Sequence, residues 1–207
     1  VHNAQYRDDP SVSNLVSMTS AEIEGALAGA GVYRFTARVR VPGIISSERE
    51  SRGVTLLGVD PLQEASVSAV GSSVVEGRNL EGPDDGGIVL GRKLAEKLET
   101  EVGKRVVLMS QDPDNEVADR GYRVVGLFEA NLAAQEEAFV FAGRETVQKM
   151  LLIDDRVSEV AVAGDDYRVV DALLAQVRAA MNDEDEVLPW TELDAYLGTM
   201  LGVMDGF

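Results

Sequence analysis

The alternation of hydrophobic and polar residues predicts several β-strands along the chain. The clearest runs over residues 33–41, and the residues that share its apolar side are Tyr33, Phe35, Ala37, Val39 and Val41. Because a period of two places neighbouring side chains on opposite faces of a strand, we expect this segment to be half buried. Further strands are predicted at residues 54–59, 88–90, 105–110, 122–129, 139–141, 157–162 and 187–188.

Apolar residues at helical spacing separate these strands. Thr19 and Glu22 form a capping box, in which the two side chains satisfy the first free amides of a helix. Ile23 and Leu27 then share one face, and the helix is expected to end at residues 29–31, where two glycines occur. Further helices are predicted at residues 92–99, 145–152, 167–181 and 191–204. Asp60 and Pro61, which end the strand at residues 54–59, also permit a helical start.

The order of these elements predicts an α+β fold. Strand and helix signals at both ends of the chain enclose a middle that is rich in hairpins. Gly103 is the expected left-handed turn between a helix and the strand that follows it. A chain of 207 residues suits two small lobes with a sizeable core.

Arg34, Arg38 and Arg40 lie on the polar side of the first long strand. A basic stripe of this kind indicates either a ligand site or a solvated strand face whose arginines pair with carboxylates. We prefer the second interpretation, because it needs no ligand.

Composition and charge remove several classes of function. The net charge of -17 repels nucleic acid phosphates, so no nucleic acid partner is expected. The chain has no cysteine and a single histidine, His2, which we expect to be a solvated terminal residue. A Ser-His-Asp triad, a thiolate nucleophile and a cysteine or multi-histidine metal site are therefore not expected.

The stretch GIVLGRKLAEKL, residues 87–98, is the only candidate for a phosphate cradle. It lacks both the Lys-Ser/Thr pair of a phosphate loop and the three spaced glycines of a dinucleotide site. Gly91 is instead expected to shape a tight corner between a strand and a helix, and no nucleotide cofactor is predicted.

The segment SQDPDNEVADRG, residues 110–121, is predicted to form a long hairpin tip. Its acidic residues suggest calcium, but counting from Asp112 places Val117 and Arg123 where a calcium loop of the EF-hand type needs glycine and a carboxylate. We therefore interpret the segment as an exposed turn and predict no metal site.

No run of residues approaches the 18 apolar positions of a membrane span, and we expect the chain to be a soluble portion of a longer protein. The first residue is Val1 and the last segment is apolar, which suggests that both ends continue into further sequence.

Several short segments, taken in order, resemble one known family. Residues 2–11 resemble the segment that leaves the first membrane helix in that family. The other matching positions are Gly91, Leu94, Ala95, Val102, Gly103, Val106, Val125, Gly126, Leu127, Phe128, Trp190 and Glu192. Their order and spacing resemble the extracytoplasmic domain of ABC-transporter permeases of the MacB and lipoprotein-releasing (LolC/LolE, FtsX-like) superfamily.

The resemblance implies the two-lobed architecture of a MacB-like periplasmic core. A Porter-like α/β lobe near the membrane would be built from residues 1–53 and 154–207. A β-rich Sabre-like lobe, residues 54–153, would be inserted between them. Transmembrane helices would continue from both ends and anchor the domain outside the inner membrane.

The resemblance also implies a non-catalytic function without cofactor or metal. A separate cytoplasmic ABC ATPase subunit would hydrolyse ATP, and this domain would couple that motion to lipoprotein release or efflux. Implied partners are the ATPase subunit, a second permease copy or paralogue, and a periplasmic carrier or adaptor protein.

The predicted hairpin tip is the candidate partner contact. In the lipoprotein-releasing branch one permease carries a hook for the periplasmic carrier there, whereas this tip is short, acidic and almost without apolar residues. The candidate residues are Asp112, Pro113, Asp114, Asn115, Glu116, Asp119 and Arg120.

Two alternatives come from other classes of protein. One is a soluble enzyme that uses Glu136, Glu137, Asp154 or Asp155 as acid and base, although adjacent carboxylates on a strand would point to opposite faces. The other is a passive extracytoplasmic binding module.

Overall fold

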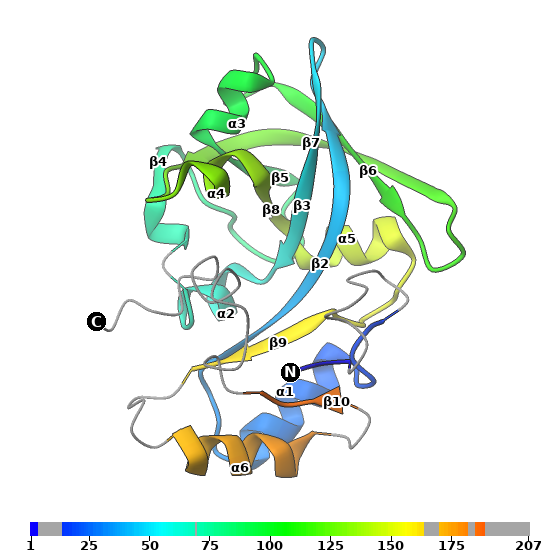
Figure 1. The fold of residues 1–207 in the computed structure, drawn as a ribbon, viewed down its shortest axis with the longest axis vertical. Coiled ribbons are helices and arrows are strands. Elements are labelled where there is room, and N and C mark those ends of the chain that lie inside the picture. Colours follow the sequence, from blue (N-terminus) through cyan, green and yellow to red (C-terminus); the bar gives the residue numbers. More distant parts are fainter. Residues whose placement is uncertain (4–13, 69, 164–169, 182–184, 189–207) are drawn as a thin grey trace.

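The fold consists of two lobes stacked along the long axis of the molecule (Figure 1). The computed structural model describes residues 1–3, 14–68, 70–163, 170–181 and 185–188. Strand β2 (Phe35–Ser46) runs through both lobes, since it pairs with different strands at its two ends.

The lower lobe in Figure 1 is a small antiparallel sheet with two helices. Its strand order is β10-β1-β9-β2, so the two ends of the described chain pair with each other, His2 opposite Glu186. Its elements are β1 (His2–Asn3), α1 (Ser20–Gly29), β9 (Glu159–Val162), α6 (Val170–Ala180) and β10 (Asp185–Glu186).

The upper lobe is a closed ring of strands. Going around it, β2 pairs with β3, β3 with β8, β8 with β5, β5 with β7, β7 with β6, and β6 returns to β2. The ring strands after β2 are β3 (Ser51–Val59), β5 (Gly87–Gly91), β6 (Arg105–Gln111), β7 (Val117–Phe128) and β8 (Phe139–Gly143). Strand β4 (Val74–Gly77) adds to the free edge of β7.

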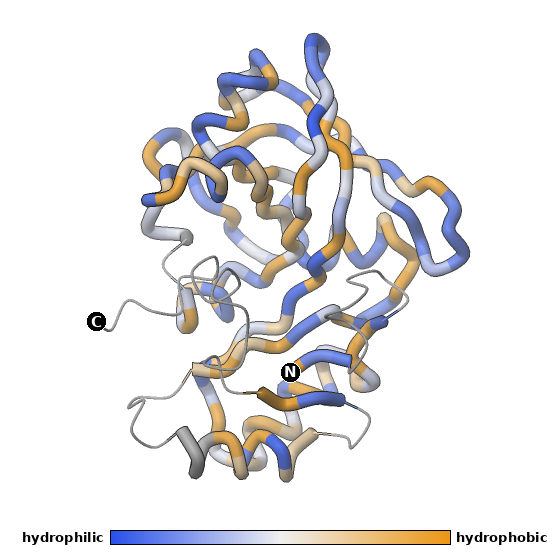
Figure 2. Tube along the Cα trace, viewed as in Figure 1, coloured by the Kyte–Doolittle hydropathy of each residue, from blue (hydrophilic) through white to orange (hydrophobic). Residues whose placement is uncertain are grey.

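Short helices cover the ring. They are α2 (Pro61–Ala65), the 3-10 helix η1 (Val70–Ser73), α3 (Arg92–Lys97), α4 (Ala133–Ala138) and α5 (Arg144–Leu151). Within the ring, alternate residues of β6 and β7 point inward, and Leu108, Tyr122 and Val124 are almost fully buried. Figure 2 shows the same alternation of hydrophobic and hydrophilic segments along the trace.

The predicted α+β class and most predicted elements are confirmed, with shifted ends. Thr19 caps α1 as the capping box requires, accepting a hydrogen bond from the Glu22 amide, and Gly103 has a positive φ of 97°. The sequence did not predict β1, β4, η1 or α4, and the last short strand lies at Asp185–Glu186 instead of residues 187–188. The predicted final helix and Trp190 lie outside the described residues.

Two burial predictions were wrong. Tyr33 was expected on the buried side of its strand, but it precedes β2 and is 75% exposed. His2 was expected in solvent, yet it is buried because β1 inserts between β9 and β10. The predicted boundary after residue 53 falls inside β3.

No helix among the described residues combines the length and the apolar character that crossing a bilayer requires.

Gly91 marks the corner between β5 and α3, but its backbone needs no special conformation. Its φ and ψ, -63° and 142°, are ordinary for any residue. The constraint is space, because a Cβ atom at this position would collide with the main-chain carbonyl of Glu136 in α4. Glycine therefore allows α3 and α4 to pack together over the ring.

We expect Gly91→Val to lower the free energy of unfolding by about 3 kcal/mol or more, since the clashing partner is backbone and cannot rotate away. Chemical denaturation of the domain measures this change. Gly53→Val is the matched control, because nothing lies within 4 Å of a Cβ there, and it should change stability little. Equal effects of the two substitutions would contradict the packing argument.

Candidate functional site

The hairpin tip between β6 and β7 is a short, well-fastened turn. The Asp112 amide donates to the Glu116 carbonyl at 2.9 Å, and Asn115 adopts a left-handed φ of 62°. The Asp112 carboxylate is buried and accepts from the amides of Asp114 and Glu116 at 2.9 and 3.0 Å. Asp112 therefore holds the turn together and offers little to a partner.

The structure separates the candidate partner-contact residues into two groups. Pro113, Asp114, Asn115 and Glu116 form the exposed tip, whereas Asp119 and Arg120 lie within β7, because both strands run further than predicted. The Arg120 guanidinium lies 5.5 Å from the ring centre of Tyr122.

Sequence reasoning missed exposed hydrophobic residues beside this tip. Ile44, Val107, Met109 and Val117 are between 36% and 66% exposed on β2, β6 and β7. The signal was present in β6, where apolar residues occupy both faces of the strand and leave the outer ones without a place in the core.

A buried cluster of charges forms where β2 passes from the lower lobe into the ring. The side chain of Arg38 is fully buried, and its Nε and Nη2 atoms donate to the Glu64 carboxylate of α2 at 2.6 to 3.1 Å. Glu159 of β9 lies 3.9 Å away on the other side of the guanidinium. The solvated-face interpretation is therefore wrong for Arg38, although its pairing with carboxylates is confirmed.

Neighbouring polar groups extend this cluster. Thr36 donates to Glu64 at 2.8 Å, and the Gln63 side-chain oxygen accepts from the Ala37 amide at 3.1 Å and from Arg144 at 3.2 Å. We call Thr36, Arg38, Gln63, Glu64, Arg144 and Glu159 the Arg38 junction. Through it α2 and α5 hold one stretch of β2.

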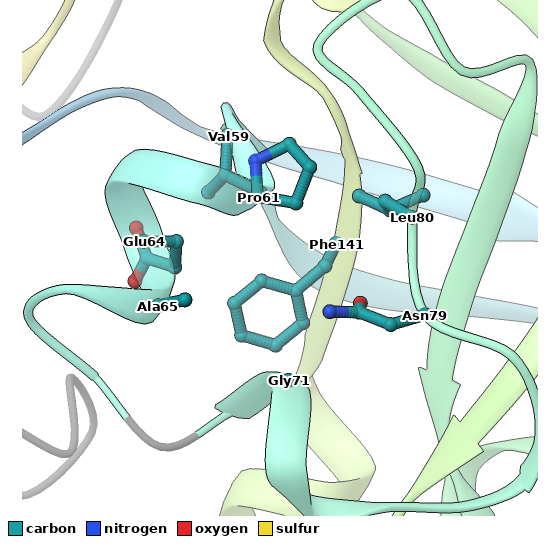
Figure 3. A pocket seen from close by; sticks show the side chains of 8 residues that line it. All are labelled: Val59, Pro61, Glu64, Ala65, Gly71, Asn79, Leu80 and Phe141. Atoms are coloured by element: carbon teal, nitrogen blue, oxygen red, sulfur yellow. The ribbon is translucent and has the colours of Figure 1, made fainter.

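A shallow hollow with a volume of about 20 Å³ lies beside the junction (Figure 3). The Phe141 ring extends into it, with Ala65 and Asn79 on either side. Its other lining residues are Val59, Pro61, Glu64, Gly71 and Leu80. Both oxygens of Glu64, the only carboxylate in this lining, are engaged by Arg38 and Thr36, so the hollow provides no unengaged acid.

The described residues contain no group of three or more side chains placed to hold a metal ion.

Comparison with known proteins identifies the family. The model of the MacB-like periplasmic core domain matches residues 3–180. The chain belongs to the MacB-like periplasmic core domain family. It is thus an extracytoplasmic domain of an ABC transporter permease, as the sequence predicted.

Solved structures of similar fold agree with this assignment. The extracellular domain of the noncanonic ABC-type transporter YknZ from Gram-positive bacteria is 16% identical with a TM-score of 0.63, covering 83% of this chain and 89% of that one. The periplasmic region of MacB from Actinobacillus actinomycetemcomitans is 15% identical with a TM-score of 0.62, covering 89% and 84%. No curated protein matches the sequence.

The carboxylates of the enzyme alternative occupy separate places in this MacB-like domain. Glu136 lies buried in α4 and accepts from the Ala130 amide at 2.8 Å, while the Lys97 ammonium donates to Glu137 and lowers the pKa of that carboxyl. Asp155 accepts hydrogen bonds from Ser20 and Ala21 at the start of α1, in the other lobe. Asp154, the fourth candidate, is exposed beside Asp155 and has a left-handed φ of 53°. The contacts of Glu136, Glu137 and Asp155 fasten local structure and do not assemble an acid-base pair.

Burial also changes the pKa of a tyrosine, Tyr122, in the interior of the ring. Desolvation raises the pKa of Tyr122, whose hydroxyl lies 2.8 Å from that of Thr146. The phenol therefore stays protonated and fastens β7 to α5.

We expect strong coupling between the two sides of the Arg38 junction. Arg38→Met and Glu64→Gln should each lower the free energy of unfolding by about 3 to 5 kcal/mol, because each leaves a buried partner uncompensated. The double variant should lose clearly less than the sum of the two. Chemical denaturation of all four proteins measures this cycle, and additivity within about 0.5 kcal/mol would show that the two side chains do not interact.

Proposed function

We propose that this domain transmits force and has no catalytic step of its own. A separate cytoplasmic ABC ATPase subunit hydrolyses ATP, and the permease helices pass the resulting displacement to the domain. The observation that carries the proposal is the continuous strand β2, which is paired in both lobes and held at their junction by Arg38 and Glu64. A buried, bidentate ion pair resists the sliding that would absorb such a displacement.

The lower lobe is the proposed entry point of the motion. His2 and Glu186 pair with each other there, so flanking helices that continue from both ends would pull on the same small sheet. In the terms of the family, this lobe is Porter-like and the ring is the Sabre-like insertion, with β2 shared between them.

The hairpin tip is the proposed contact with an extracytoplasmic partner. Its exposed residues, Pro113, Asp114, Asn115 and Glu116, include no large apolar side chain that could act as a hook. This chemistry favours MacB-like efflux, with an adaptor protein at the tip, over lipoprotein transfer to a carrier.

Gln63→Ala tests the transmission without removing a buried charge. It deletes the oxygen through which α2 bonds both β2 and α5, while the direct bond from Arg144 to the Ala37 carbonyl remains. We therefore expect the reconstituted full-length permease to keep ATP hydrolysis while transport per ATP falls several-fold. Leu62→Ala on the same helix is the control, because Leu62 is 81% exposed. Unchanged transport per ATP in Gln63→Ala, with normal folding, would refute transmission through the junction.

Replacing residues 112–116 with an Asn-Gly turn tests the tip. Because the flanking strands stay paired, we expect the unfolding midpoint to stay within the range of surface substitutions. Transport by the full permease should be lost if the tip meets a partner. Shortening the turn at residues 47–50 in the same way is the control, and normal transport by the first variant would exclude the tip as a contact.

A further inference from the structure

The outer face of the β6–β7 hairpin carries an apolar strip that the fold does not use. Ile44 of β2 pairs with Met109 of β6, Val107 lies two residues further along β6, and Val117 is opposite Gln111. These four residues, which we call the Met109 face, are 48%, 36%, 41% and 66% exposed in the order Ile44, Met109, Val107 and Val117. Contiguous exposed apolar side chains on a sheet mark an interaction surface.

Charge is distributed unevenly along the same hairpin. Its base carries Arg105 and Arg123, which are directly opposite each other in the strand register. Like charges in this position repel. In the part of the chain that the structure describes, no carboxylate forms an ion pair with Arg105 or Arg123. The tip carries Asp114 and Glu116, which are exposed. One end of the face is therefore basic and the other acidic, and Asp119, exposed and opposite Met109 in the register, adds a negative charge between them.

Met109 lies near the centre of this polar arrangement. It lies four positions after Arg105, which is about 13 Å along a strand, and the acidic tip begins at a similar distance on the other side. A two-fold rotation about an axis through Met109 would thus place the basic base of one hairpin over the acidic tip of another. The apolar strips would meet between them.

We propose that the Met109 face is an isologous contact between two copies of this chain. The proposal rests on the proposed function and on the second permease copy that the family resemblance implies. The same face supplies both the cationic and the anionic half of the contact, as a two-fold interface requires. At a net charge of -17 per chain most of the surface would repel a second copy, so a face whose basic end can meet the acidic end of its counterpart is where two copies can approach.

The size of the face sets the strength of the contact. Its exposed side chains are too few for the roughly 1,600 Å² that a stable soluble complex buries. The contact is therefore weak between free domains and forms when the membrane holds two copies at high effective concentration.

A single cysteine tests this geometry, because a residue on a two-fold axis meets its own counterpart. The chain contains no cysteine, so Met109→Cys can be introduced into a full-length permease whose other cysteines are changed to serine. Mild oxidation in membranes should give a disulfide-linked dimer about tenfold faster than Val75→Cys, a control that is 48% exposed on β4. Equal rates for the two, or a Met109→Cys disulfide to a different protein, would overturn the proposal.

Charge reversal provides the second arm of the test. In the Met109→Cys background, Arg105→Glu with Arg123→Glu should abolish the cross-link, and so should Asp114→Lys with Glu116→Lys. Co-expression of the two reversed permeases should restore it, because each then offers the charge that the other needs. Failure to restore the cross-link between two folded, inserted variants would refute the charge pairing.

The cross-linking readout is independent of transport. Should Met109→Cys cross-link as expected while Gln63→Ala leaves coupling intact, the interface would stand and the proposed force transmission would fail. If Met109→Cys does not cross-link while Gln63→Ala lowers transport per ATP, the interface alone would be refuted.

Discussion

The complete burial of the Arg38 guanidinium is the constraint on which the two-lobed arrangement depends. An arginine cannot lose its charge, and an unpaired buried charge would cost more than the domain can tolerate. Glu64 must therefore reach it from α2, which requires the chain to turn back immediately after β3. Glu159 approaches from β9 in the other lobe, so a single cation ties three separated segments together.

The local parts of this fold were predictable from the sequence because their causes are local. Thr19 caps α1 through its own neighbours, Asp60 and Pro61 start α2 at the end of β3, and the alternation in β2 follows from burial of one face. The family resemblance rested on the same kind of signal, since a glycine at a corner and apolar residues after it have fixed spacing. Even so, the sequence explained Gly91 by the tight corner at its own position. The structure shows that a side chain is excluded there by the carbonyl of Glu136, far along the chain.

What the sequence did not predict depends on pairings between distant segments. Return of β6 to β2 closes the ring, and nothing within either strand indicates that partner. The burial of Arg38 has the same origin, because an arginine on the polar side of an alternating strand is solvated unless another element covers it. His2 became buried for the equally remote reason that β10 pairs with β1. The hairpin tip was placed correctly but drawn too long, since Asp119 and Arg120 pair within β7 instead of extending the turn.

Closure of the ring also limits how this domain can meet other proteins. A closed ring gives each of β2, β3, β5, β6, β7 and β8 two neighbours, so in the described part of this lobe a partner strand could be added at β4 or where a strand runs past one neighbour, as at residues 117–122 of β7 and 51–54 of β3. Binding elsewhere must use side chains on outer faces and turns. On a surface this acidic, most outer faces repel other acidic proteins, which leaves faces that combine apolar residues with arginine. The outer side of β6 and β7 has this combination because β6 carries apolar residues on both of its faces while the core can bury only one.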